Sequence, residues 1–172
     1  MHRLAHHVTR LCAGALSVAL IATTTPAAAE PAAPAAVANE AALECLAKAV
    51  YFEARGEPLD GQRAVAEVIL NRVDSPRFPS TVCGVVTQGN RSGCQFSYHC
   101  SGRSLAIREQ AAYSRATRVA ASALAGRPRV LTDGATYFHT RAVRPGWSKR
   151  FTRTAQIGQH IFYRQDQRVA MR

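Results

Sequence analysis

Apolar side chains recur at helical spacing between residues 41 and 55, and a helix stop follows directly. The repeating positions, at steps of three and four, are Leu43, Leu46 and Val50. This stripe predicts an amphipathic helix over residues 41–55, with an apolar face that must be buried against other elements. Gly56 and Pro58 favour the end of the helix at this point. The fold is therefore expected to start with a helix whose apolar face packs against other elements of the domain.

Two further helices are predicted downstream. Asp60 is a candidate N-cap for a helix that ends near Val73. The expected buried face of this helix comprises Ala64, Val65, Val68 and Ile69. A short helical turn is expected after Ser80. Residues 107–124 repeat apolar positions at helical spacing, and their alanine-rich face favours close packing against another helix.

Short β segments are predicted between and after these helices. Residues 95–98 suit a short strand or hairpin, and residues 135–139 and 160–163 suit two strands joined by a loop around Trp147. The chain has 172 residues, of which 47% are hydrophobic, and this is room for one ordinary core. The predicted fold class is α+β, mainly helical with a small β element.

The N-terminal residues have the pattern of an export signal. Two arginines flank the start of an apolar stretch of roughly 12 residues, and an Ala-x-Ala site ends at Ala29. A membrane-spanning helix is the alternative, but it needs about 20 apolar residues. We therefore expect a signal peptide at 1–29, a flexible leader at 30–40 and the folded domain at 41–172. The mature protein is expected in the periplasm, outside the cell or in the cell wall, without an integral membrane segment.

The charge of the chain is strongly positive. It carries 22 basic and 11 acidic residues, a net charge of +11. Loss of residues 1–29 would leave 20 basic and 11 acidic residues, or +9, so the basicity belongs to the domain. Export argues against nucleic acid as the partner, although the charge alone permits it. An anionic polymer outside the cytoplasm fits better.

Four cysteines remain after the predicted signal peptide, and they are Cys45, Cys83, Cys94 and Cys100. An even number in an exported protein indicates two disulfides, for which three connectivities exist. We expect the pairs Cys45–Cys83 and Cys94–Cys100. The alternatives are a zinc site that uses Cys94, His99 and Cys100, and a nucleophilic cysteine with a histidine base.

Glu53 lies where the apolar stripe of the first helix continues, three residues after Val50. A carboxylate in the last turn of a helix is disfavoured by the negative end of the helix dipole. Partial burial also favours its protonated form. Both effects suit a general acid. Ion pairing with Arg55 would oppose them, and a Glu53 that is simply solvated at the helix end is the alternative.

A set of motifs that spans about residues 42–164 resembles the cell-wall hydrolases of the spore-cortex-lytic enzyme family. The similar segments are 49–58 (AVYFEARGEP), 61–73 (GQRAVAEVILNRV), 78–79 (FP), 83–86 (CGVV), 94–97 (CQFS), 135–139 (ATYFH) and 157–163 (IGQHIFY). The resemblance implies a goose-lysozyme-like, lytic-transglycosylase-like fold. It implies peptidoglycan as the substrate and the first glutamate of the motif, Glu53, as the catalytic acid, with no metal or cofactor.

The resemblance implies cleavage of the β-1,4 bond between N-acetylmuramic acid and N-acetylglucosamine. Lytic transglycosylases close the muramyl 6-hydroxyl on C1 to give a 1,6-anhydro product, and hydrolysis by water is the alternative. Glycosidases normally use two carboxylates. Glu57 is the nearest candidate for the second carboxylate, but it follows a helix stop. The preferred interpretation is that it organises the loop, and a substrate contact is the alternative.

The other candidate substrate contacts are Gln95, Ser97 and Tyr137, which offer hydrogen bonds, and Trp147, which offers a face for sugar stacking. A basic run from Arg141 to Arg153 can meet the carboxylates of the wall. Two other functions fit the same sequence. A cell-wall amidase or peptidase would require a zinc cluster or an activated cysteine, and a non-catalytic, basic wall-binding domain would need no catalytic residue.

Overall fold

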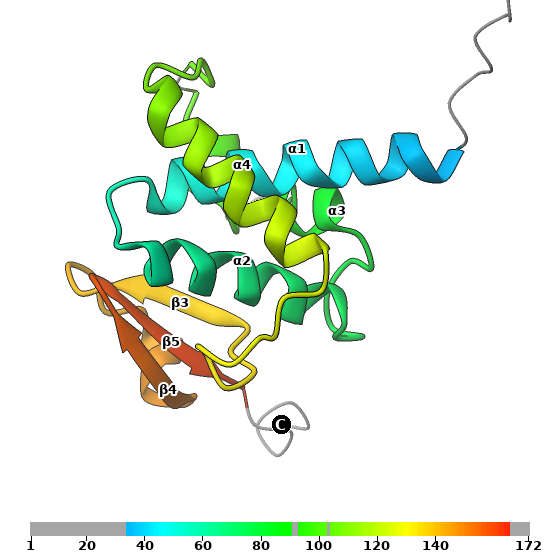
Figure 1. Cartoon of the computed structure of the whole chain (residues 1–172). Coiled ribbons are helices and arrows are strands. Elements are labelled where there is room, and N and C mark those ends of the chain that lie inside the picture. The colour runs from blue at the N-terminus through cyan, green and yellow to red at the C-terminus, as the bar shows by residue number, and fades with distance from the viewer. Residues whose placement is uncertain (1–33, 91–92, 103, 166–172) are drawn as a thin grey trace, which may run out of the picture. The chain divides into compact units, whose positions relative to one another are not determined.

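The computed structural model describes residues 34–90, 93–102 and 104–165, and shows a helical layer beside a small antiparallel sheet (Figure 1). The helices are α1 (Pro34–Ala54), α2 (Leu59–Val73), α3 (Val82–Val86) and α4 (Gln110–Leu124). The predicted α+β class is therefore confirmed. The predicted signal peptide, residues 1–29, lies outside the described residues.

Helix α1 begins at Pro34, so residues 34–40, which were expected in a flexible leader, are helical. The predicted stripe is found in the core, where Leu46 and Val50 are fully buried and Leu43 packs partly buried against them. The helix ends at Ala54, one residue before Arg55, and Glu53 lies in its last turn. The stripe thus leads directly from the core to the candidate acid.

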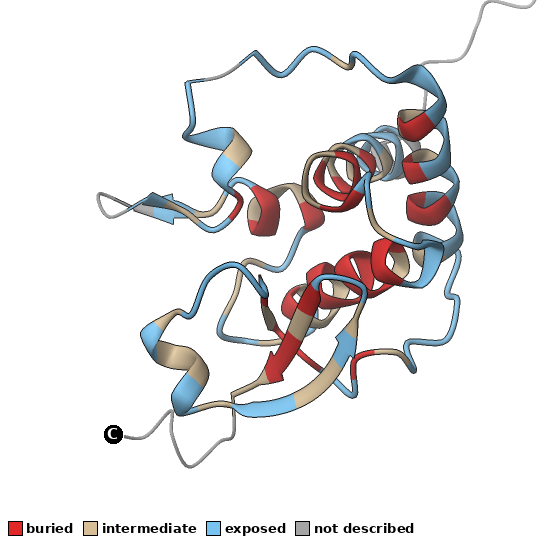
Figure 2. Cartoon of the chain, turned by 90° about the vertical axis from the view of Figure 1, so that its left-hand side faces the viewer, coloured by how far each residue is buried: buried red, intermediate tan, exposed pale blue. Residues whose placement is uncertain are grey.

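Helix α2 lies at the centre of the domain, and two of its faces are therefore buried. Val65, Ala66 and Ile69 pack into the core shared with α1 and α4, while Ala64 and Val68 pack against the sheet. Figure 2 shows buried residues where the helices face one another and where the sheet faces α2. The predicted buried face of α2 is confirmed.

Two details of the predicted helices are corrected. Asp60 does not cap α2: it is the second residue of the helix, and its carboxylate pairs with Arg63 at 2.9 Å. Helix α4 begins at Gln110, and Ile107 lies in the segment that precedes it. Its alanine face packs as predicted, because Ala112, Ala116 and Ala120 are all buried in the core that α1 also forms.

The sheet has three strands, β3 (Tyr137–Thr140), β4 (Thr152–Ile157) and β5 (His160–Arg164), in the order β3-β5-β4. All pairs are antiparallel, with Tyr137 opposite Tyr163. Strands β3 and β5 correspond to the predicted ones. Strand β4 was expected as loop, because its sequence TRTAQI has few apolar side chains. It is an edge strand, and only Ala155 and Ile157 reach the core beneath it.

The expected strand at 95–98 is replaced by other elements. A minimal hairpin pairs β1 (Gly89–Asn90) with β2 (Gly93–Cys94), and a 3₁₀ turn, η1 (Ser97–His99), follows. Phe96, directly before η1, is almost fully buried in the core that α1 and α2 also form. A second 3₁₀ turn, η2 (Gly146–Lys149), surrounds Trp147.

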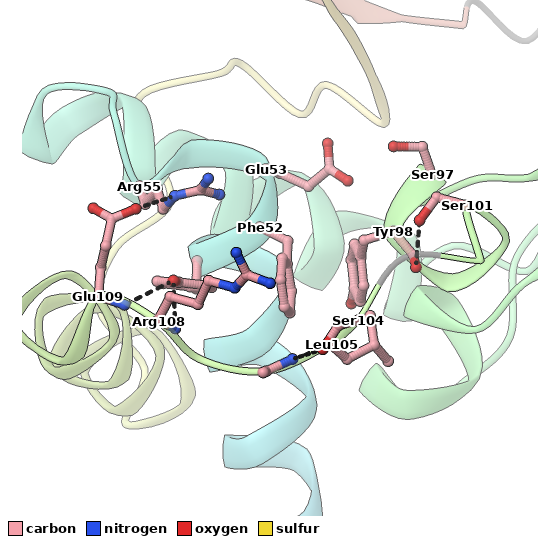
Figure 3. Close-up of a pocket in the computed structure, with 12 residues that line it drawn as sticks. Phe52, Glu53, Arg55, Ser97, Tyr98, Ser101, Ser104, Leu105, Arg108 and Glu109 are labelled. Atoms are coloured by element: carbon pink, nitrogen blue, oxygen red, sulfur yellow. Dashed lines mark hydrogen bonds and ion pairs between the residues drawn. The ribbon is translucent and has the colours of Figure 1, made fainter.

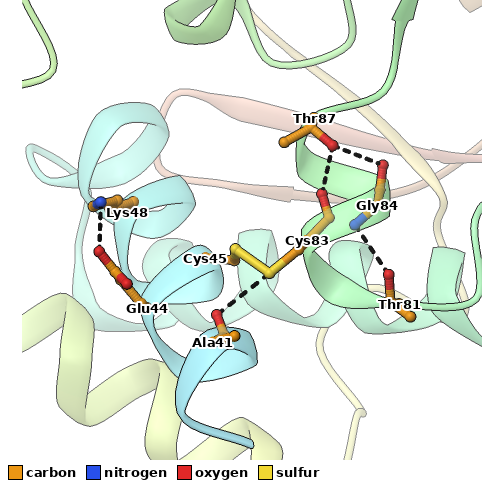
Figure 4. The surroundings of a disulfide bond; sticks show 8 residues. All are labelled: Ala41, Glu44, Cys45, Lys48, Thr81, Cys83, Gly84 and Thr87. Carbon is orange, nitrogen blue, oxygen red and sulfur yellow. Dashed lines mark hydrogen bonds and ion pairs between the residues drawn. A yellow bond between two sulfur atoms is a disulfide. The ribbon is translucent and has the colours of Figure 1, made fainter. Parts of the chain in front are cut away.

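Both predicted disulfides are present, Cys45–Cys83 and Cys94–Cys100. The first joins α1 to α3, where the hydroxyl of Thr81 caps the short helix by accepting a hydrogen bond from the Gly84 N–H at 3.1 Å (Figure 4). The entropy model gives about 4 kcal/mol for a loop of this length and about 2.5 kcal/mol for the shorter one. The second disulfide uses both cysteines of the alternative zinc site.

No helix in the described part of the chain is both long and apolar enough to cross a membrane.

Candidate functional site

A pocket of about 540 Å³ opens at the C-terminal end of α1. The last turn of α1, the η1 turn and the segment before α4 form its walls (Figure 3). The lining residues are Tyr51, Phe52, Glu53, Arg55, Ser97, Tyr98, Ser101, Ser104, Leu105, Ala106, Arg108 and Glu109. Glu53 and Ser97, both predicted from the sequence, are thus brought together.

Glu53 is half-buried at the edge of this pocket, and Figure 3 shows its carboxyl group pointing away from the helix backbone. Burial raises the pKa of the Glu53 carboxyl from its ordinary value of 4.5 to about 7, although the positive charge of Arg72 opposes the shift. The negative end of the helix dipole acts in the same direction as burial. A substantial fraction of Glu53 is therefore protonated at neutral pH, as a general acid requires.

Arg55 does not pair with Glu53. Its Nε donates a hydrogen bond to the Glu109 carboxylate at 2.8 Å, across the pocket wall. The hydroxyl of Tyr51 accepts hydrogen bonds from the backbone N–H groups of Arg108 and Glu109, at 3.3 and 3.2 Å. These contacts attach the segment before α4 to the last turns of α1. Arg55, the cation nearest to Glu53 in sequence, therefore stabilises the pocket wall.

An aromatic stack forms the floor of the pocket. Phe52 of α1 and Tyr98 of η1 lie nearly parallel, with ring centroids 4.8 Å apart. The Cys94–Cys100 disulfide closes the loop that carries Ser97 and Tyr98. The hydroxyl of Ser101 donates a hydrogen bond to the Tyr98 carbonyl at 3.3 Å. The loop is thereby held against α1 even though it contains only one helical turn.

Arg72 is the buried cation that acts on Glu53. Only 3% of it is exposed, and its Nε donates a hydrogen bond to the Thr136 carbonyl at 2.6 Å. Its guanidinium lies 5.2 to 5.6 Å from the ring centroids of Phe78, Phe96 and Tyr137. Burial lowers the pKa of the Arg72 guanidinium to about 10, while Tyr137 and Glu53 act to raise it. Arg72 therefore stays charged at neutral pH beside the candidate acid.

Glu57 does not line the pocket. Its carboxylate accepts a hydrogen bond from the backbone N–H of Gln159 at 2.9 Å, and it lies 3.9 Å from His160 Nδ1. Burial lowers the pKa of His160, with Glu57 acting in the opposite direction and His139 adding to the lowering. The geometry supports the loop-organising alternative for Glu57, because the side chain joins the α1–α2 connection to the turn between β4 and β5.

Gly158→Ala is expected to destabilise the protein through this contact. Gly158 has φ +57°, and a Cβ added there would overlap the Glu57 carboxylate. The strained backbone and the displaced hydrogen bond together predict a loss of about 2 kcal/mol in unfolding free energy. Urea unfolding would measure it. Gly126→Ala is the matched control because Gly126 also has a positive φ, +86°, and nothing lies within 4 Å of its added Cβ. Equal stability of the two variants would contradict the Glu57 contact.

The other predicted site residues lie outside the pocket lining. Gln95 is exposed, and its backbone N–H donates to the Gln88 carbonyl at 2.9 Å. Tyr137 and Trp147 are half-buried on the sheet side, with ring centroids 5.3 Å apart. Tyr137 is nevertheless connected to the site because its ring contacts the Arg72 guanidinium.

Sequence reasoning missed several residues that build the site. Arg72, Phe52, Tyr98 and Glu109 each act on Glu53 or on the pocket walls, and they lie in four different segments of the chain. Arg72 occupies a position at the end of α2 where an exposed basic residue is ordinary. Only the aromatic residues around it, at positions 78, 96 and 137, distinguish it, and they come together through tertiary packing.

The comparisons with known proteins agree with this architecture. The family model described as Cell Wall Hydrolase matches residues 56–163, more than half of the chain. The chain belongs to the cell wall hydrolase family. The matched range begins just after Glu53, so the assignment of the acid depends on the geometry described above and on the motif around it.

Relatives of the chain include spore cortex-lytic enzymes. The chain is 38% identical to the spore cortex-lytic enzyme of Halalkalibacterium halodurans over 121 residues. This alignment covers 70% of this chain and 34% of the relative. A stretch of 44 residues is 61% identical to the Bacillus subtilis enzyme, covering 26% of this chain and 14% of the relative. The chain thus spans about a third or less of the length of these relatives.

Two solved structures share the fold. The catalytic domain of the Bacillus cereus SleB protein is 35% identical to this chain and superposes with a TM-score of 0.59. The superposition covers 73% of this chain and 91% of that domain. The catalytic domain of the germination-specific lytic transglycosylase SleB from Bacillus anthracis is 34% identical, with a TM-score of 0.59 and coverage of 72% and 93%. The fold of this member of the family is therefore that of a cell-wall-lytic catalytic domain, consistent with the predicted lysozyme-like class.

Proposed function

We propose that the protein cleaves the glycan strands of peptidoglycan, at the β-1,4 bond between N-acetylmuramic acid and N-acetylglucosamine, with Glu53 as the general acid and base. The observation that carries the proposal is a half-buried carboxyl group with a pKa of about 7 at the edge of an open pocket. The family and the lytic-transglycosylase domain of similar fold support the same substrate.

The pocket favours a mechanism with one catalytic carboxyl group. Among the residues that line it, Glu53 and Glu109 are the two that carry carboxyl groups, and Glu109 is largely exposed and paired with Arg55. A carboxylate that is neutralised by an ion pair is a poor nucleophile and a poor base. Glu57, the second carboxylate considered from the sequence, is occupied by Gln159.

Lytic transglycosylation needs only Glu53. The protonated carboxyl group donates its proton to the glycosidic oxygen, and the bond from muramyl C1 to that oxygen breaks. The carboxylate then accepts the proton of the muramyl 6-hydroxyl, while O6 forms a bond with C1 and closes the 1,6-anhydro ring. Glu53 ends in its starting protonation state. Hydrolysis replaces the 6-hydroxyl with water and yields a reducing end.

Mass spectrometry of digested sacculi tests the proposal. Anhydromuramyl ends are expected, and reducing muramyl ends would assign hydrolysis instead. Cleaved stem peptides without new glycan ends would favour the amidase or peptidase alternative, and a protein that binds sacculi without any product would favour the non-catalytic wall-binding domain. Either of the last two results overturns the proposed function.

A further inference from the structure

The segment that forms the sheet carries positive charge and no negative charge of its own. Residues 134–164 contain six basic residues and no acidic residue. The basic residues are Arg141, Arg144, Lys149, Arg150, Arg153 and Arg164. Arg164 pairs with Asp133 just outside this segment, which leaves five cations. The excess positive charge of the domain is thus concentrated around the η2 turn and strand β4.

None of these five cations forms an ion pair with a carboxylate in the described residues. Arg141 donates two hydrogen bonds to the Gln159 side chain, at 3.1 and 2.9 Å, and Arg153 donates to that of Gln156. Arg144, Lys149 and Arg150 are exposed, and none of them forms an ion pair with a carboxylate in the described part of the chain. Their charges are therefore available to an anionic partner.

Half-buried aromatic rings lie among these cations. Trp147 is stacked on Phe151 at 5.6 Å, and Tyr137 lies 5.3 Å from Trp147 and 4.8 Å from Phe151. Buried rings of the sheet support the group from beneath, since Trp147 contacts His139 at 5.6 Å and Tyr163 at 5.4 Å. A rigid aromatic surface of this kind suits stacking against sugar rings.

The aromatic group continues toward the candidate acid. Tyr137 lies 5.6 Å from the guanidinium of Arg72, which acts electrostatically on Glu53. The aromatic group therefore lies next to the buried cation that acts on Glu53. The contacts among the rings distinguish the surface from a scattered set of solvated charges.

We propose that Tyr137, Trp147 and Phe151, with the surrounding cations Arg141, Arg144, Lys149, Arg150 and Arg153, form a second contact surface for peptidoglycan. The rings stack on sugars of the strand, and the cations pair with the carboxylates of its stem peptides. The inference rests on the proposed function for the identity of the polymer. It adds a binding surface that the catalytic step does not require, so its loss lowers the affinity for whole walls and spares chemistry on short fragments.

Binding to purified sacculi tests this surface without relying on catalysis. The full chain carrying Glu53→Gln is the background, so the sacculi stay intact. The test variant adds Arg144→Ser, Lys149→Ser and Arg150→Ser, and the matched control adds Arg115→Ser, Arg118→Ser and Arg127→Ser, which are exposed on and just after α4. Both triple variants change the net charge equally. The test variant is expected to bind about tenfold more weakly at low salt, while the control changes little.

Chemical treatment of the sacculi identifies the partner. Amidation of the wall carboxylates with ethanolamine is expected to weaken binding and to remove the difference between the two triple variants. Hydrofluoric acid, which strips phosphate polymers, is expected to leave binding unchanged. Equal losses in both triple variants, or loss of binding only after hydrofluoric acid, would overturn the proposal. A Glu53→Gln protein that still cleaves walls would overturn the catalytic role alone, because the binding comparison is scored separately.

Discussion

Glu53→Gln is expected to lower the rate of sacculus cleavage by about 10²–10⁴-fold, because the amide has no proton of suitable acidity to donate to the leaving oxygen. The side chain keeps its size, so the pocket keeps its shape. Release of soluble fragments from sacculi measures the rate. Glu44→Gln is the matched control, since Glu44 lies on the same helix, is exposed and pairs with Lys48 away from the pocket. Full activity of the Glu53→Gln protein would remove Glu53 from the mechanism.

The same substitution is expected to stabilise the protein at alkaline pH. The pKa of Glu53 is about 7 in the folded state and 4.5 ordinarily, so ionisation opposes folding as the pH rises from 4.5 through 7. Glu53→Gln removes this cost and should raise the unfolding free energy at pH 8 by about 1–3 kcal/mol relative to wild type. Below pH 4.5 the two proteins should differ little. A difference that does not depend on pH would contradict the raised pKa.

Arg72→Met is expected to shift the pH dependence of cleavage toward higher pH. Arg72 lowers the pKa of Glu53, so its removal raises that pKa and keeps the acid protonated further above pH 7. The maximal rate should fall by roughly tenfold or more, because the carboxylate formed after proton donation loses a neighbouring positive charge. The activity profile between pH 5 and 9 measures both effects, and ¹³C NMR of the Glu53 carboxyl group measures the pKa directly.

Two further variants separate charge from packing. Arg72→Lys keeps a positive charge and should return the Glu53 pKa toward that of wild type, although lysine lacks the planar donor group that binds the Thr136 carbonyl. Arg63→Met removes a cation from the same helix that pairs with Asp60, and it should leave the pH profile unchanged. An Arg72→Met protein that stays folded, with an unshifted profile and an unshifted Glu53 pKa, would contradict the electrostatic role of Arg72.

Local patterns in the sequence were sufficient to predict the helices and the candidate acid. The stripe through Leu46 and Val50 continues to Glu53, and this periodicity, together with the motif around it, made Glu53 the candidate acid, although a solvated Glu53 was the alternative. Two disulfides were also expected from cysteine number and export, although these alone allow three connectivities. These features depend on short spacings or on covalent chemistry. The strand expected at 95–98 was wrong because burial of Phe96 outweighs its β propensity, and β4 was missed because an edge strand needs few apolar side chains.

The sequence by itself determined that an apolar helix stripe leads to Glu53 near a helix end, in a strongly basic chain. Only the tertiary structure decided what surrounds that acid. Arg55 pairs with Glu109, 54 residues away, and leaves Glu53 to the influence of Arg72. Arg72 is held in turn by the carbonyl of Thr136, 64 residues away. Long-range contacts of this kind have no local periodicity, because they depend on how α2 packs between the other helices and the sheet, and that packing sets the pKa on which the proposed chemistry depends.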